Sequence, residues 1–194
     1  MKKIGFFLFK YRSYTPLPFV FVLIIFRKPS ALSLIIGALV SVTGELIRLW
    51  AVSYAGSETR TTDGVGGSNL VTQGPFYYIR NPLYLGNILI YTGIGIMSFA
   101  LFPWLQVFAA GYFFFQYYCI IFNEEDFLRV KFEHKFGMYC SSVNRFFPKF
   151  GKLPAEIISV LPFDFKEGLK SERRTFQALL ITSAIILIYY FIFK

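Results

Sequence analysis

Four long apolar stretches restrict the fold of this chain more than any other feature. They cover residues 31–54, 83–102, 104–122 and 176–193. Each approaches or exceeds the roughly 20 residues that a helix needs to cross about 30 Å of hydrocarbon. Hydrophobic residues make up 55% of the 194, which excludes an ordinary soluble domain and a disordered chain. The sequence therefore predicts an all-α, polytopic bundle of helices in a membrane.

A fifth candidate span, residues 17–26, is short. As a helix it would rise only about 15 Å, so whether it crosses the membrane stays open. The apolar run at 5–9 is similar to that of a signal peptide, but Lys10 and Arg12 interrupt it and no small-residue cleavage site follows. We expect the N-terminus to be retained and the bundle to contain about five membrane helices.

Basic residues are distributed unevenly along the chain, which carries a formal net charge of +9. In a membrane protein such residues accumulate in cytoplasmic loops. If residues 17–26 cross, the two sides differ greatly: one holds Lys2, Lys3, Lys10, Arg12, Arg60, Arg80 and the basic stretch 129–174, and the other only Arg27, Lys28 and Lys194. We therefore expect the N-terminus and the segments 56–74 and 122–176 in the cytoplasm. A nucleic-acid partner is not needed to explain the charge.

The first long span contains two charged residues, Glu45 and Arg48, which lie three positions apart and so on one face of a helix. Charged groups at membrane depth are costly unless they are paired or functional. Two interpretations stay open: an ion pair near the cytoplasmic end, or the polar wall of a binding cavity.

The glycine-rich loop at 56–74 also has two interpretations. Its glycines permit close approach to a ligand, but they suit a flexible connection equally well.

The remaining organisation follows from breaks in the apolar pattern. Pro103 alone separates two spans, which predicts a tight helical hairpin. After Phe122 the apolar residues become periodic, with charged residues between them, and predict a cytoplasmic amphipathic helix: Leu128, Phe132 and Phe136. A basic interfacial segment and the last helix occupy 151–194. We expect residues 1–194 to form one domain, with its motifs in a core at about 44–148.

Two polar constellations stand where spans meet the cytoplasm. The first lies within residues 70–86, LVTQGPFYYIRNPLYLG. Pro82 suits the first turn of a helix, so Arg80 and Asn81 lie at a helix entrance whose exposed N–H groups favour an anion. Alternatively, Asn81 is only the N-terminal cap of that helix.

The second constellation is Asn123-Glu124-Glu125, at the point where the fourth long span leaves the hydrocarbon. These acids form either a functional pair or a solvated helix face, on which Arg129 is an i to i+4 partner for Glu125. The two cysteines, Cys119 and Cys140, form no Cys-x-x-Cys motif and have no histidine cluster near them in the sequence. They indicate neither a disulfide framework nor a metal site, so no metal is expected.

In their order, these motifs resemble the isoprenylcysteine carboxyl methyltransferase and phospholipid methyltransferase superfamily. The resemblance covers roughly residues 44–148 and rests on Gly-Pro-Phe at 74–76, Arg-Asn-Pro-Leu-Tyr-Leu-Gly at 80–86, the hairpin, and Glu-Glu-x-x-Leu at 124–128. Four further matching residues are Tyr139, Val143, Arg145 and Pro148. Each element alone is weak, but several in the right order are specific.

The resemblance implies S-adenosylmethionine as cofactor and S-adenosylhomocysteine as product. Residue by residue, it assigns cofactor binding to Ser68, Asn69, Leu70, Val71, Phe76, Asn81, Pro82, Leu83, Tyr84 and Glu124. Asn81 replaces the histidine of the prenylcysteine enzymes, and Ile120 replaces an arginine of their eukaryotic members. Phospholipid methyltransferases similarly carry Asn-Pro at the place of Asn81 and Pro82, so the resemblance does not decide which substrate is methylated.

We accordingly expect an S-adenosylmethionine-dependent methyltransferase with its active site facing the cytoplasm and a lipophilic or prenylated substrate arriving from the surrounding lipids. The first expectation is O-methylation of the α-carboxylate of an isoprenylcysteine. Arg80 would orient the anionic group, Glu124 would contact the cofactor, and Glu125 would do the same or act as a base. The alternatives are N-methylation of a phospholipid amine, a nicotinamide-dependent sterol reductase, and a non-catalytic lipid-binding or transporter protein.

Overall fold

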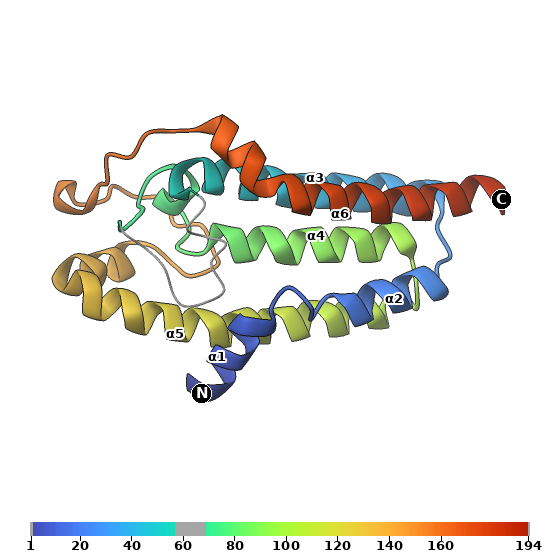
Figure 1. The fold of residues 1–194 in the computed structure, drawn as a ribbon, viewed down its shortest axis with the longest axis horizontal. Helices are drawn as coiled ribbons and strands as arrows, with labels where there is room; N and C mark the ends of the chain where they lie inside the picture. Colours follow the sequence, from blue (N-terminus) through green and yellow to red (C-terminus); the bar gives the residue numbers. More distant parts are fainter. Residues whose placement is uncertain (1, 57–68, 194) are drawn as a thin grey trace.

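The long helices run side by side in a computed structural model that describes residues 2–56 and 69–193 (Figure 1). The α-helices are α1 (Lys2–Tyr11), α2 (Leu17–Ile25), α3 (Ala31–Ala55), α4 (Pro82–Ser98), α5 (Trp104–Ser142) and α6 (Phe165–Ile192), and two 3₁₀ turns are η2 (Gly74–Tyr77) and η3 (Ala155–Ile157). Helix α4 lies between the pair α3–α6 and helix α5. The predicted all-α membrane bundle is confirmed.

Within the described residues three helices, α3, α5 and α6, are long and apolar enough to cross a membrane, and α4 is a shorter apolar helix of 17 residues. The apolar run that predicts this span continues to residue 102, whereas α4 ends at Ser98. Phe99 adopts a left-handed conformation (φ 53°) that stops the helix. Gln106 of α5 then donates to the carbonyl oxygens of Gly95 and Ala100 at 2.9 and 3.1 Å, so the predicted hairpin closes early.

Glycines bring α3 and α4 into backbone contact. A Cβ atom on Gly44 would lie 2.6 Å from the carbonyl oxygen of Gly86, and one on Gly93 would lie 2.2 Å from Ser41 Oγ. Small residues at helix contacts are typical of membrane bundles, because they let backbones approach and gain van der Waals contact. We call the end of the bundle where α3 finishes and α4 begins the motif end, and the opposite end, at the α4–α5 turn, the hairpin end.

The N-terminal segment connects these two ends. At the motif end α1 packs on α5, where a Cβ atom on Gly5 would lie 2.5 Å from both Asn123 Nδ2 and the carbonyl oxygen of Cys119. At the hairpin end the Lys28 N–H donates to the Ser98 carbonyl at 2.8 Å. Helix α2, the short fifth candidate, covers only nine residues of this path.

The predicted amphipathic helix is the continuation of α5 beyond the span. It bends at Glu133, where φ is 41°, and its last turns carry Phe136 and Tyr139 into a small core at the motif end. The charged run 166–174 was expected to be an interfacial segment separate from the last helix. It instead forms the first turns of α6, which begins at Phe165 because Asp164 caps it by accepting from the Glu167 N–H.

Candidate functional site

Glu125 lies at the centre of an ion cluster at the motif end. It is 6% exposed. Arg145 donates to it from Nε at 3.0 Å and from Nη2 at 2.6 Å, and Arg80 Nη2 lies 3.1 Å from Oε1. The two arginines meet because an isolated parallel bridge pairs Ile79 with Asn144, and the Arg80 N–H donates to the Asn144 carbonyl at 2.9 Å. The alternative of Glu125 on a solvated face is therefore wrong.

The cluster of Arg80, Glu125 and Arg145 carries a net charge of about +1 when all three groups are ionised. Hydrogen bonding to Glu125 raises the pKa of Arg145 further above its usual range, so this guanidinium stays charged. Arg80 Nε is buried and has no hydrogen-bond partner among the described residues. Because buried donors are normally satisfied, this atom is a donor that an acceptor from a ligand could satisfy.

Glu124, the neighbouring acid, has different surroundings. It is partly buried and accepts a hydrogen bond from Tyr84 Oη at 2.6 Å, which joins α5 to the first turn of α4. The Tyr84 ring stacks on Tyr117 with 4.7 Å between centroids, and Phe113 follows at 6.4 Å from Tyr117. An aromatic column, Tyr84–Tyr117–Phe113, thus extends from Glu124 toward the hairpin end.

The other motif residues support this geometry. Asn81 precedes α4 but does not cap it through its side chain, which instead donates to the Arg145 carbonyl at 3.3 Å. Pro82 is buried in the first turn, as predicted, and the Leu83 carbonyl faces Arg48 Nη1 at 3.5 Å. The Phe76 carbonyl accepts from Tyr139 Oη at 2.6 Å.

The predicted cofactor-binding segment before η2 is only partly described. Ser68 lies outside the described residues. Asn69 is exposed, whereas Leu70 and Val71 are half-buried and Leu70 packs against the small core that contains Tyr139. The structure therefore gathers Arg80, Asn81, Tyr84, Glu124 and Glu125 at the motif end, and of the segment 69–71 it packs Leu70 against the small core there.

A second ion cluster lies inside the bundle, and the sequence indicated Arg48 in it but not Glu172 or Asn87. Arg48 donates from Nε and Nη2 to the carboxylate of Glu172 at 2.8–3.1 Å and from Nη1 to Asn87 Oδ1 at 2.6 Å. Its hydrogen-bonded acid is therefore Glu172 on α6, although Glu45 is also buried, at 2% exposure. Glu172 was overlooked because it stands in the charged run 166–174. Glu172 lies four residues after Gly168, so the two residues share one face of α6, and both are buried.

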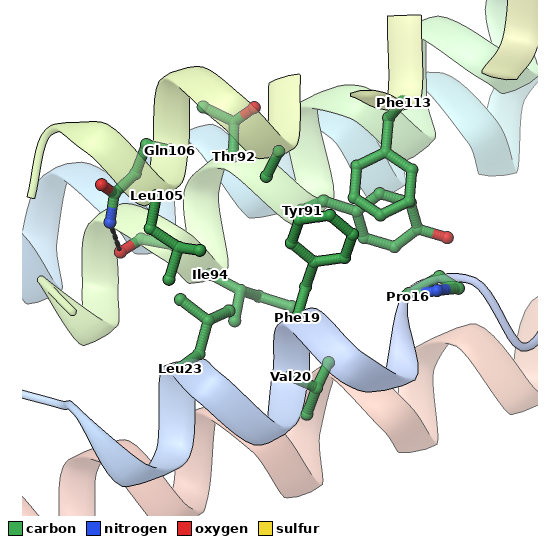
Figure 2. A pocket seen from close by; sticks show the side chains of 12 residues that line it. Pro16, Phe19, Val20, Leu23, Tyr91, Thr92, Ile94, Leu105, Gln106 and Phe113 are labelled. Atoms are coloured by element: carbon green, nitrogen blue, oxygen red, sulfur yellow. Dashed lines mark hydrogen bonds between the residues drawn. The ribbon is translucent and has the colours of Figure 1, made fainter. Parts of the chain in front are cut away.

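An apolar pocket of about 30 Å³ lies between α2, α4 and α5 (Figure 2). Aromatic side chains line it, including Phe19, Tyr91 and Phe113. Tyr91 is seven residues beyond Tyr84, or about 10 Å along the helix, so this pocket is removed from the ion cluster. None of Arg80, Asn81, Tyr84, Glu124 and Glu125 lines this pocket. Among the described residues no group of three His, Cys, Asp or Glu is placed to hold a metal.

Comparison with known proteins gives one match. A model of the family described as phospholipid methyltransferase matches residues 32–135. This range contains α3, α4 and most of α5, and with them Arg80, Glu124 and Glu125, but it ends before Arg145 and Glu172. No curated protein and no solved structure matches the chain significantly.

Proposed function

Because this chain belongs to the phospholipid methyltransferase family, and so to the wider isoprenylcysteine and phospholipid methyltransferase superfamily of membrane methyltransferases, we propose that it methylates a lipid that carries an anionic group. The observation that carries the proposal is the placement of two unlike sites side by side. A cationic cluster surrounds Glu125, and an acidic, aromatic site surrounds Glu124. The methyl acceptor is assigned to the first site and the methyl donor to the second.

The cationic cluster suits a carboxylate or phosphate. Guanidinium groups bind these anions through parallel hydrogen bonds, and the buried Arg80 Nε offers a donor for one. We favour the α-carboxylate of an isoprenylcysteine. A carboxylate is itself the nucleophile, so no proton has to leave. Arg80 then has only to hold one carboxylate oxygen while the other is aimed along the line of transfer.

The donor site is consistent with S-adenosylmethionine, which when bound supplies a methyl group on a sulfonium and leaves as the neutral thioether. Glu124 offers a carboxylate to ribose hydroxyls or to an ammonium group. Tyr84 holds this carboxylate at 2.6 Å and so fixes its direction. The rings of Tyr84 and Tyr117 exclude water from one side of Glu124, which strengthens electrostatic interactions there.

The aromatic column also supports a lipophilic acceptor. From Glu124 it runs through Tyr84, Tyr117 and Phe113 toward the apolar pocket, which Phe113 lines (Figure 2). The pocket's volume of about 30 Å³ is far below that of a prenyl or acyl chain. The hydrocarbon part of the substrate would therefore have to displace side chains of α2, such as Phe19.

A second candidate reaction is N-methylation of a phospholipid amine. The family match favours it, and so does Asn81, which stands where phospholipid methyltransferases also carry Asn-Pro. An ammonium group must lose a proton before it attacks. The sequence suggested Glu125 as the base, but two arginines bind that carboxylate, so we assign the proton to Glu124 instead. In that reaction the cationic cluster would hold the phosphodiester of the head group.

One experiment separates the two reactions. Purified protein in detergent is incubated with methyl-labelled S-adenosylmethionine and either N-acetyl-farnesylcysteine or phosphatidylethanolamine. Label in the first acceptor should be released by mild alkali as methanol, because it is an ester, whereas label on nitrogen is stable. Farnesylcysteine methyl ester is the matched control, since its carboxylate is blocked. Transfer to neither acceptor, together with no calorimetric binding of S-adenosylhomocysteine, would contradict the proposal.

A further inference from the structure

Glu172 is fully buried although the basic residues near it in the sequence are exposed. Lys170, Arg173 and Arg174 all face outward on α6. Glu172 shares its inward face with Gly168, which lies one helical turn earlier and is also buried. A carboxylate inside a bundle is costly unless it is paired, so this inward position requires a specific partner.

The start of α6 is shaped to bring Glu172 inward. A Cβ atom on Gly168 would lie 2.3 Å from Ser53 Oγ, so α6 approaches the end of α3 as closely as only glycine permits. The Asp164 N–H also donates to the Ser53 carbonyl at 2.8 Å. These contacts place the first turns of α6 beside the last turns of α3, and Glu172 then reaches Arg48.

Arg48 passes this contact on to α4. Its guanidinium binds Glu172 through Nε and Nη2 and, through Nη1, the side chain of Asn87 at 2.6 Å. Its stem packs on Gly86, where a Cβ atom would lie 2.5 Å from Arg48 Cγ. One buried side chain therefore binds α6 and the first two turns of α4 together.

The same turns of α4 carry the donor site. Tyr84 lies one residue beyond Leu83, whose carbonyl faces Arg48, and three residues before Asn87. Tyr84 and Asn87 belong to the same rigid helix. A rotation of α4 about its axis would therefore move the Tyr84 hydroxyl away from Glu124 and Asn87 away from Arg48 together. The bond from Arg48 to Asn87 opposes that rotation.

We propose that Arg48, Asn87 and Glu172 are positioning residues for methyl transfer. They fix the rotation of α4 and hence the contact between Tyr84 and Glu124, with the last helix, which lies beyond the family match, as the support. This inference rests on the proposed function, because methyl transfer is its readout. The simpler alternative is a latch between α3 and α6 that contributes to stability alone.

Asn87 variants separate the two roles, because they leave the ion pair of Arg48 and Glu172 in place. In Asn87→Ala, kcat should fall at least about tenfold, the loss expected when a hydrogen bond to a charged group disappears. The midpoint of thermal unfolding in detergent should fall less than in Glu172→Ala, which leaves the buried Arg48 guanidinium without its carboxylate. Asn87→Asp keeps the acceptor oxygen and should recover most of the lost kcat. The matched control is Glu167→Gln, which breaks the exposed pair with Lys170 and should leave kcat unchanged.

A charge exchange provides the second measurement. Arg48→Glu combined with Glu172→Arg keeps an ion pair between α3 and α6 but moves the guanidinium away from Asn87. Unfolding should recover relative to either single variant while kcat stays low. Recovery of both quantities, or an Asn87→Ala variant with wild-type kcat, would overturn the positioning role. Wild-type protein that transfers no methyl group to any acceptor would instead reject the proposed function, so the two failures are distinguishable.

Discussion

Glu124 and Glu125 are adjacent in the chain, yet they belong to different regions of the molecule. Glu125 is buried between two guanidinium groups that come from the loops before α4 and after α5. Glu124 is partly buried against an aromatic column and accepts from Tyr84. Neighbouring helix positions point about 100° apart, so each acid faces a different set of elements. Glu125 therefore pairs with two arginines, whereas Glu124 accepts a hydrogen bond from Tyr84, and the proposed ligand-binding role falls to Glu124.

Removing Glu125 should have the largest effect. Glu125→Ala leaves the guanidinium groups of Arg80 and Arg145 close together without their counter-charge, which costs roughly 3–5 kcal/mol for a buried pair. We expect a strong loss of folded protein, measured as thermal unfolding in detergent. The control is Glu156→Ala, since Glu156 is exposed on η3. Wild-type stability in Glu125→Ala would show that this acid is not the centre of the cluster.

Glu124→Gln should give the opposite pattern. The amide oxygen can still accept from Tyr84, so unfolding should shift by less than about 1 kcal/mol. The lost negative charge should weaken the binding of S-adenosylhomocysteine by about ten- to a hundredfold, measured by calorimetry on the purified protein. If Glu124→Gln instead destabilises the protein but leaves the affinity for S-adenosylhomocysteine unchanged, the roles that we assign to Glu124 and Glu125 are wrong.

Arg80→Lys tests the acceptor side of the comparison. Lysine keeps the positive charge toward Glu125 but loses the flat, forked donor that binds an anion in parallel. We expect kcat/KM for N-acetyl-farnesylcysteine to fall about tenfold, with the affinity for S-adenosylhomocysteine unchanged. If the affinity for the nucleoside falls instead, Arg80 belongs to the donor site.

Tyr84→Phe should have the smallest effect. It removes the 2.6 Å hydrogen bond to Glu124 but keeps the stacked ring on Tyr117. A single hydrogen bond contributes about 1 kcal/mol, so affinity for the nucleoside should fall about threefold to tenfold. Tyr77→Phe is the matched control, since its hydroxyl accepts from the Leu153 N–H elsewhere at the motif end. An equal effect of the two variants would remove the special role of Tyr84.

Much of the fold could be predicted because long apolar runs are local signals. The run at 31–54 became α3 within one residue, and Pro82 began α4 as expected. The end of α4 was not predictable, because a phenylalanine in a left-handed conformation depends on Gln106 across the turn. The start of α6 was missed because its charged turns do not resemble a membrane helix, although Asp164 is an ordinary cap.

The site was predictable in its residue types and not in its pairings. The motifs indicated Arg80 and the two acids, but they could not show that Arg145, 20 residues beyond Glu125, supplies the second guanidinium. Helical spacing placed Glu45 and Arg48 on one face, yet a face does not reveal which helix lies opposite. The partner of Arg48 is Glu172, 124 residues away, and only the packing of α6 on α3 brings them together.

The bridge between Ile79 and Asn144 has a consequence for where this protein can be divided. The similarity to the family ends at residue 135, but the strand-like contact draws the chain after α5 back to the loop before α4. A fragment cut at 135 would keep both acids and one arginine, and it would lose the cation that binds Glu125 through two nitrogens. A unit that keeps the complete ion cluster is therefore larger than the matched region, and a split or grafted version that preserves this cluster carries residues 143–149 with it.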